Sequence, residues 1–219
     1  FKIALEIIAK HKFSKFINGP ISKKYFLKGK NLGITEYLAS KTNNNNVVML
    51  IFNTKLSVSP ITTHLAIKDV SKNITKKKIH THVKVITDFY KRNFKKVPKI
   101  AITGLNPHCE SNFHNSEEDK IIIPAIKTLK DKKFNVKGPF SADTIFMKEQ
   151  LKKFDVIIGM YHDQILTPMK ALCGFDAINI TLGLPFIRIS PDHGPNSAML
   201  GKNLSNPKSL VEALKFFDK

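Results

Sequence analysis

The sequence lacks the features that mark membrane, secreted and disulfide-rich proteins. Its 219 residues contain only two cysteines, Cys109 and Cys173, and no secretory signal opens the chain. The longest apolar runs, such as 47–52, have the length of a strand and fall far short of the roughly 20 residues that span a bilayer. We therefore expect a globular protein with no membrane span, placed in the reducing cytoplasm.

Arginine is scarce although the chain is strongly basic. The 36 basic and 17 acidic residues give a formal net charge of +19, yet only Arg92 and Arg188 are arginines. Such a charge raises nucleic acid as a partner. The lysines, however, are spread through every segment, and the dense stretches at 76–78 and 95–99 lack the interleaved aromatic side chains on which bases stack. A solvated lysine surface is favoured, and a lysine-rich nucleic-acid-binding module stays as the alternative.

The chain also lacks both common glycine-rich phosphate-binding motifs. Neither G-x-G-x-x-G after a strand nor G-x-x-x-x-G-K-[ST] is present, so spacing alone predicts no nicotinamide cofactor. The two cysteines lack the C-x-x-C spacing of structural zinc sites, which favours small buried thiols over a cysteine nucleophile.

Most of the chain alternates between β-rich runs and apolar residues at helical spacing. This alternation predicts an α/β fold with a largely parallel sheet. The strands are expected at 16–18, 47–52, 56–62, 99–103, 155–160 and 177–182, and a further short run lies at 134–136. The helices are expected at 2–12, 78–94, 117–130, 144–153, 163–172 and 207–217.

Histidines follow three of the predicted strands. His64, then His108 with His114, and finally His162 each come shortly after a strand ends. Because the carboxyl ends of parallel strands meet at one edge of a sheet, these side chains can converge. Three imidazoles with an open coordination position would hold a divalent cation that polarises a substrate oxygen.

Two questions about this histidine group stay open on spacing alone. Either His108 or His114 can be the third ligand, and each histidine can instead cap a loop or satisfy a buried amide. Asp143 and Asp163 are near enough in the chain to ligate, to orient an imidazole or to transfer a proton.

A second group of residues suits a small anion. Arg188 offers a planar fork for phosphate or carboxylate, Lys170 a point charge, and Asn179 a hydrogen bond. Together they indicate a phosphorylated substrate.

Eight strings that run in order along nearly the whole chain resemble one enzyme family. They are NGPISK (18–23), GITE (33–36), TTHL (62–65), GLNPH (104–108), GPFSADT (138–144), MYHDQ (160–164), NITLGLPFIR (179–188) and DHG (192–194). With them the chain is similar to the 4-hydroxythreonine-4-phosphate dehydrogenase family of pyridoxal phosphate biosynthesis.

The resemblance implies two α/β/α domains with largely parallel sheets, as in isocitrate and isopropylmalate dehydrogenases, which also lack the usual glycine fingerprint. Residues 1–21 and 181–219 would be the remnant of a discontinuous first domain, and 22–180 the second domain with the metal and substrate residues. The chain begins at Phe1 inside a helical pattern, so we expect a fragment. The N-terminal part of the first domain, which builds part of the cofactor cleft, is expected to be missing. The chain as given is therefore expected to lack turnover.

The resemblance also implies a homodimer whose site is shared between subunits and uses NAD with one divalent cation, zinc, magnesium or cobalt. The implied metal ligands are His64, His114 and His162, which selects His114 over His108. The implied substrate contacts are Thr35, Lys170, Asn179 and Arg188. The candidate catalytic residues are Asp143, Asp163 and Lys170.

The implied reaction is the oxidation of 4-phosphohydroxy-L-threonine to a 2-amino-3-oxo acid phosphate, which loses carbon dioxide to give 3-amino-2-oxopropyl phosphate. One departure matters, because Ile34 stands where the family usually has a histidine that contacts the substrate. A dehydrogenase of threonate or erythronate 4-phosphate is therefore the alternative within the family, and a non-catalytic remnant that only dimerises is a further one.

Overall fold

The computed structural model describes residues 1–27, 33–44, 46–109, 115–174 and 176–218. The chain forms two compact units: unit 1 comprises residues 1–47 and 175–219, and unit 2 comprises residues 48–174. The predicted domains, 1–21 with 181–219 and 22–180, concern the complete enzyme and stay a prediction.

Unit 2 is built on a mostly parallel sheet. Its strands pair in the order β2-β3-β6-β4-β5, with β2 antiparallel to β3 and the other neighbours parallel. The strand bounds are β2 Val48–Phe52, β3 Ser57–Thr62, β4 Ile100–Thr103, β5 Val136–Phe140 and β6 Val156–Tyr161. Strands β3, β4 and β6 are buried along nearly their whole length, which explains the apolar runs of β4 and β6. In β3 the buried hydroxyls of Ser57 and Ser59 are hydrogen-bonded to the Tyr90 hydroxyl and the Met49 carbonyl.

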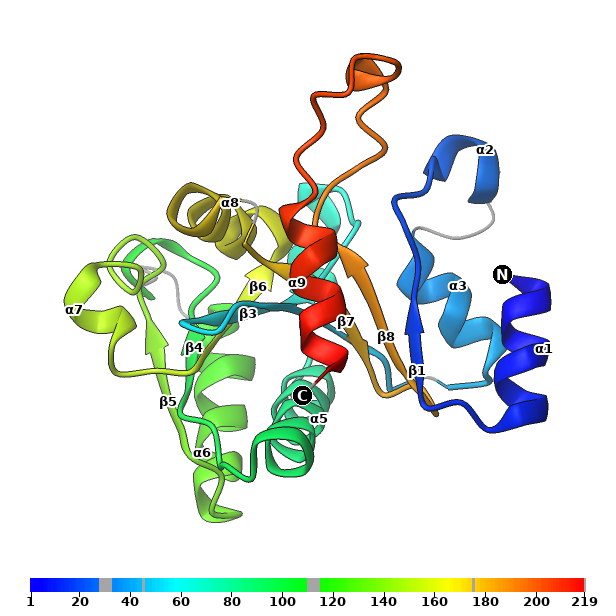
Figure 1. Cartoon of the computed structure of the whole chain (residues 1–219). Coiled ribbons are helices and arrows are strands. Elements are labelled where there is room, and N and C mark those ends of the chain that lie inside the picture. Colours follow the sequence, from blue (N-terminus) through cyan, green and yellow to red (C-terminus); the bar gives the residue numbers. More distant parts are fainter. Residues whose placement is uncertain (28–32, 45, 110–114, 175, 219) are drawn as a thin grey trace. The chain divides into compact units, whose positions relative to one another are not determined.

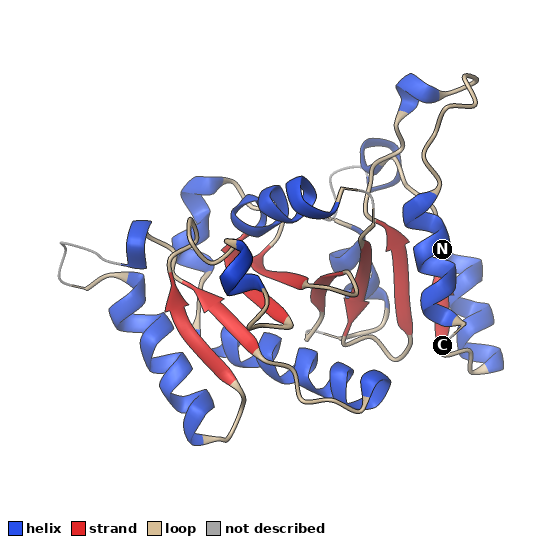
Figure 2. Cartoon of the chain, turned by 60° about the vertical axis from the view of Figure 1, so that its left-hand side comes forward, coloured by secondary structure: helices blue, strands red, loops and turns tan. Residues whose placement is uncertain are grey.

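Helices lie on both sides of these strands (Figure 2). Their bounds are α4 Val70–Asn73, α5 Lys76–Phe94, α6 Ile123–Asp131, α7 Lys148–Leu151 and α8 His162–Cys173, with a π-helical turn at Glu118–Ile122 and 3-10 turns at Ile67–Asp69 and Pro107–Cys109. In α5 the side chains of Ile79, Val83 and Ile86 are fully buried at helical spacing. The hydroxyl of Thr75 caps this helix by accepting the Lys78 N–H at 3.2 Å.

Unit 1 combines a small mixed sheet with helices (Figure 1). Its strands pair in the order β1-β8-β7, with β1 parallel and β7 antiparallel to β8. The bounds are β1 Lys15–Ile17, β7 Ile178–Leu182, β8 Ile187–Pro191, α1 Lys2–His11, α2 Lys23–Leu27, α3 Ile34–Lys41 and α9 Lys208–Phe217, with a 3-10 turn at Ser197–Met199. Leu27, Ile34 and Leu38 form an apolar cluster of this unit.

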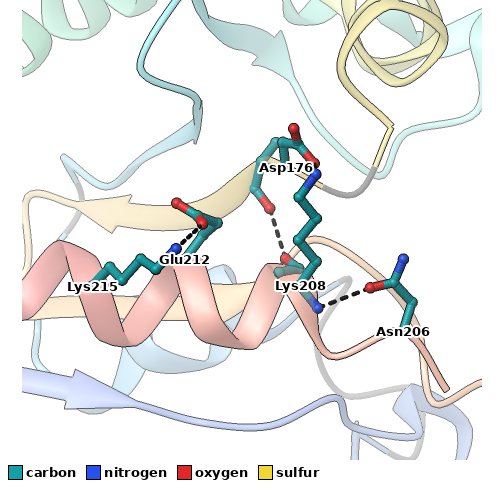
Figure 3. Close-up of polar contacts among 7 residues, drawn as sticks. Asp176, Asn206, Lys208, Glu212 and Lys215 are labelled. Atoms are coloured by element: carbon teal, nitrogen blue, oxygen red, sulfur yellow. Dashed lines mark hydrogen bonds and ion pairs between the residues drawn. The ribbon is translucent and has the colours of Figure 1, made fainter.

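Polar contacts fix the start of α9 against the strands of unit 1 (Figure 3). Lys208 pairs with Asp176 at 2.6 Å, and its backbone N–H donates to the Asn206 side chain at 3.0 Å. The hydroxyl of Ser209 donates to the Ala177 carbonyl at 2.7 Å, directly before β7. These bonds satisfy groups at a helix end that would otherwise lack partners.

The α/β class and the mostly parallel sheet are confirmed, and two predicted elements are corrected. The helix expected at 144–153 is reduced to α7, because Met147 has an extended backbone and the preceding residues form turns. The run at 134–136 is replaced by strand β5, which begins at Val136 and ends at Phe140. Only glycine fits at position 138 of this strand, because φ is +141° and a Cβ there would lie 2.3 Å from the Ile102 carbonyl oxygen. Strand β8 and helix α3 were not predicted. Within the described residues, the structure contains no helix with both the length and the apolar character of a membrane span.

Candidate functional site

The three strands that precede the predicted histidine ligands are neighbours in unit 2. Strands β3, β6 and β4 run parallel in that order. His64 lies two residues beyond β3, and His162 is the first residue of α8, directly after β6. His108 follows β4, whereas His114 lies outside the described residues. The prediction that histidines follow the carboxyl ends of adjacent parallel strands is thus confirmed for His64, His108 and His162.

His64 and His162 lie close together. Their ring centroids are 5.8 Å apart with an interplanar angle of 39°, a separation from which both imidazoles can reach one cation. Nδ1 of His162 lies 2.6 Å from a carboxylate oxygen of Asp163, so Nε2 is the nitrogen left to face a ligand. A carboxylate that holds one ring nitrogen in this way commonly orients a metal-binding histidine.

The two described imidazoles, of His64 and His162, are donors that fit a divalent cation. Among the residues that the structure places, no group of three His, Cys, Asp or Glu side chains gathers around one point. Two of the three predicted ligands are therefore together, and the ligand role of all three stays a prediction.

The second candidate aspartate lies beside a different histidine. Asp143 follows β5, and its carboxylate is 3.7 Å from Nδ1 of His108. The hydroxyl of Ser141 donates to Asp143 and, with the nearby His108 ring, lowers the pKa of this exposed carboxyl. Asp143 and Asp163 thus accompany separate imidazoles.

Arg188 is a buried cation in unit 1. It lies on β8 with 3% of its surface exposed. Its Nε donates to the side-chain oxygen of Asn18 at 2.7 Å, and Nη1 donates to the Thr181 hydroxyl at 3.2 Å. Burial lowers the pKa of Arg188 to about 10, so the group stays charged at neutral pH. Within the described part of the chain, no carboxylate forms an ion pair with it, which leaves its charge to be balanced by an anion.

The other predicted substrate contacts are divided between the units. Thr35 on α3 is buried and Asn179 lies on β7, both in unit 1, whereas Lys170 on α8 is exposed in unit 2. The side-chain oxygen of Asn179 is buried and has no hydrogen-bond partner among the described residues. Since Thr181 pairs with Arg188 in the register of β7 and β8, and Asn179 is two residues from Thr181, all three side chains are on one face of these strands.

Gln164 was not anticipated from the sequence. Its Oε1 accepts the Met160 N–H at 2.7 Å and the Thr103 hydroxyl at 3.0 Å. Its Nε2 donates to the Gly104 carbonyl at 2.9 Å. On the other flank of β6, the Thr62 hydroxyl donates to the Met160 carbonyl at 2.8 Å. From the sequence, Gln164 was known only as the last residue of the string MYHDQ, two residues after His162.

Glu118 was not anticipated either. Its buried carboxylate accepts the backbone N–H groups of Leu105 at 2.7 Å and Asn106 at 2.9 Å, and also the Asn106 side-chain amide at 2.7 Å. Burial alone would raise the pKa of Glu118, but these hydrogen bonds outweigh it and hold the pKa below its ordinary value. An ionised Glu118 therefore anchors the loop that leaves β4.

Sequence comparison places the whole chain in one family. The family model described as "Pyridoxal phosphate biosynthetic protein PdxA" matches residues 1–217. A 4-hydroxythreonine-4-phosphate dehydrogenase from Sulfurihydrogenibium sp. is 43% identical over 216 residues, which cover 97% of this chain and 66% of the relative. A protein from Oceanobacillus iheyensis named "Putative D-threonate 4-phosphate dehydrogenase" is 37% identical over 218 residues, 97% of this chain and 65% of the relative.

Solved structures agree. The crystal structure of 4-hydroxythreonine-4-phosphate dehydrogenase from Klebsiella pneumoniae has a TM-score of 0.81 and 31% identity, covering 98% of this chain and 67% of that one. Isocitrate dehydrogenase from Methylococcus capsulatus shares the fold, as predicted. Its TM-score is 0.62 at 13% identity, covering 100% of this chain and 70% of that one. The chain spans slightly less than two thirds of the length of the two curated relatives. It belongs to the pyridoxal phosphate biosynthetic protein PdxA family.

Proposed function

We propose that the complete protein is an NAD- and divalent-metal-dependent dehydrogenase of pyridoxal 5'-phosphate biosynthesis. It would oxidise 4-phosphohydroxy-L-threonine to a 2-amino-3-oxo acid phosphate, which loses carbon dioxide to give 3-amino-2-oxopropyl phosphate. Membership of the family and the name of the Sulfurihydrogenibium relative support this reaction.

The observation that carries the proposal is the buried guanidinium of Arg188. A cation that is buried without a carboxylate among the described residues calls for an anionic ligand, and its planar fork matches the oxygens of a phosphate. Thr35, Lys170 and Asn179 are the other proposed substrate contacts. Holding the phosphate end keeps the reacting carbon in a fixed position.

At the reacting end, His64, His114 and His162 would hold a zinc, magnesium or cobalt ion. Such an ion lowers the pKa of an alcohol that it binds and withdraws electrons during decarboxylation, and NAD accepts the hydride. Asp163 fixes the orientation of the His162 ring through its contact at Nδ1. Asp143 and Asp163 are the proposed proton-transfer residues, and Lys170 is the third proposed catalytic residue. The two carboxylates contact His108 and His162, respectively.

We also propose that the enzyme is a cytoplasmic homodimer with a site shared between subunits, as the family resemblance implies. A second substrate is supported by two observations. The Oceanobacillus iheyensis relative is named for D-threonate 4-phosphate, and Ile34 is buried in the apolar cluster with Leu27 and Leu38, so this position offers no polar group to a substrate amine. A threonate or erythronate 4-phosphate dehydrogenase is therefore the second candidate.

An NADH-formation assay on the protein over its whole natural length tests the proposal. The substrates are 4-phosphohydroxythreonine and the 4-phosphates of threonate and erythronate, each with Mg²⁺, Mn²⁺, Co²⁺ or Zn²⁺. His162→Ala should abolish metal-dependent turnover, whereas His11→Ala, an exposed residue at the end of α1, should not. Unchanged turnover in His162→Ala contradicts the metal mechanism. Salt-sensitive binding of nucleic acid without metal uptake would favour the lysine-rich module instead.

A further inference from the structure

A chain of hydrogen bonds crosses the carboxyl ends of β3, β6 and β4. It begins at Thr62, whose hydroxyl donates to the Met160 carbonyl. It continues with Gln164, whose Oε1 accepts the Met160 N–H. The last register pair between β4 and β6 is Ile102 with Ile158, so the Met160 N–H lies beyond the backbone ladder. On this flank a side chain therefore takes the place of the neighbouring strand, whereas on the β3 flank the strand register continues to the pair Thr62 with Tyr161 and the Thr62 hydroxyl adds to it.

Gln164 extends the chain from β6 to β4. Its single amide accepts the Thr103 hydroxyl and donates to the Gly104 carbonyl, in addition to its bond with Met160. Beyond Gly104, the next two backbone N–H groups are held by Glu118. A glutamine suits this position because one planar group supplies both a strong acceptor and a donor.

Close packing leaves this amide little freedom. A Cβ at Gly159 would lie 3.0 Å from Oε1 of Gln164 and 2.3 Å from Cγ2 of Ile165. A Cβ at Gly104 would lie 2.9 Å from Oε1 of Glu118. Glycine at both positions lets the backbone approach these polar side chains closely.

The chain of hydrogen bonds fixes the backbone positions next to the proposed metal ligands. His64 lies two residues after Thr62, and His162 lies between Met160 and Gln164 in sequence. The loop anchored by Glu118 leads in sequence to the third proposed ligand. The geometry points to Gln164 as a positioning residue of the metal site, one that sets the separation of the His64 and His162 rings without touching the cation. This inference rests on the proposed function and adds to it a residue outside the ligand set.

Cobalt binding by the full-length protein tests the inference. Gln164→Met keeps the length of the side chain but leaves the Met160 N–H and the Gly104 carbonyl without their partner. We expect isothermal titration calorimetry to show affinity for Co²⁺ weakened by about 10- to 100-fold, the range typical of residues that support metal ligands. At saturating Co²⁺, the visible absorption bands should shift, because the ligand geometry changes.

Two further variants control this experiment. Gln150→Met makes the same chemical change on α7, where the amide contacts only Lys153 among the described residues, and should leave affinity and spectrum unchanged. Thr103→Val removes one donor to Gln164 and should weaken Co²⁺ binding less than Gln164→Met does. The two losses should not add in the double variant, since both act through the same amide. Thr103→Val also carries the test if Gln164→Met does not unfold cooperatively.

The outcomes separate this inference from the proposed function. If the parent protein binds Co²⁺ and Gln164→Met binds it equally well with the same spectrum, the positioning role is wrong and the metal mechanism stands. A lower melting temperature with unchanged Co²⁺ affinity also rejects the positioning role, because Gln164 then serves the fold alone. If the parent protein itself binds no Co²⁺, the metal part of the proposed function fails first, and the positioning role fails with it.

Discussion

Replacing Arg188 with methionine should remove phosphate binding while lowering the stability of the free protein only moderately. Burial lowers the pKa of Arg188 from 12.5 to about 10, which corresponds to about 3 kcal/mol opposing the buried charge. Methionine relieves this penalty but loses the hydrogen bonds to Asn18 and Thr181, each of which contributes about 1.5–3 kcal/mol when the donor is charged. Because these effects oppose each other, we expect the free energy of unfolding to fall by no more than about 3 kcal/mol.

Thermal unfolding in chloride and in inorganic phosphate, at equal ionic strength, measures how much bound phosphate stabilises the protein. A ligand at 100 times its dissociation constant stabilises the folded state by about 2.7 kcal/mol, so phosphate should raise the melting temperature of the parent protein. It should not raise that of Arg188→Met. The only other arginine supplies the matched control: Arg92 is exposed on α5, where Nε donates to the Asp88 carbonyl at 3.3 Å, and Arg92→Met should keep the full response to phosphate.

Two results would refute the assignment of Arg188 to an anion. One is a phosphate response that survives in Arg188→Met. The other is a loss of more than about 4 kcal/mol in the absence of phosphate, which would identify the guanidinium as a structural group whose hydrogen bonds outweigh its burial.

Two further predictions concern unit 2. His82 is buried with its ring nitrogens against two backbone carbonyl oxygens, and burial lowers its pKa from 6.5 to about 4. The unfolded chain takes up this proton near pH 6.5 and the folded protein only near pH 4, so stability falls by about 3 kcal/mol as the pH drops through this window. His82→Gln should lose less stability than the parent between pH 7.5 and 4.5 in urea unfolding; equal losses would contradict this. Gly159→Ala should lower the free energy of unfolding by about 1–3 kcal/mol, since its Cβ would lie 2.3 Å from Ile165. Gly19→Ala places its Cβ in open space and should lower it by less than about 0.5 kcal/mol. Equal effects in urea unfolding would show that the surroundings of Gly159 relax freely.

The fold was predictable where burial imposes a pattern on the sequence. Strand β6, at Val156–Tyr161, is buried almost throughout, so its residues form the continuous apolar run that predicted a strand at 155–160. The helix at 144–153 was overpredicted because helical spacing of apolar residues does not show that 142–146 form turns or that Met147 has an extended backbone. Strand β8 was not predicted: its run, Ile187–Pro191, is short and closely follows a glycine and a proline, residues typical of turns.

The candidate site was predictable to the extent that it depends on strand ends. The order β3-β6-β4 brings His64 and His162 together, as the position of each histidine after a strand suggested. Gln164 and Glu118 were not found, because they bind backbone groups, and any polar residue in the first turns of a helix looks alike in sequence. Asn18 was likewise known only as part of a motif until its contact with Arg188 was seen.

The buried cation of unit 1 shows why the count of basic residues was a poor guide to function. Lysine supplies 34 of the 36 basic residues, so its presence at any one position says little. At Arg188 the choice between the two side chains has a chemical consequence. Burial lowers the pKa of this guanidinium to about 10, and the same shift applied to a lysine, whose ordinary value is 10.5, would bring it to about 8. A lysine there would be partly neutral at the upper end of the physiological range, whereas arginine keeps its charge and offers two parallel N–H donors to a phosphate.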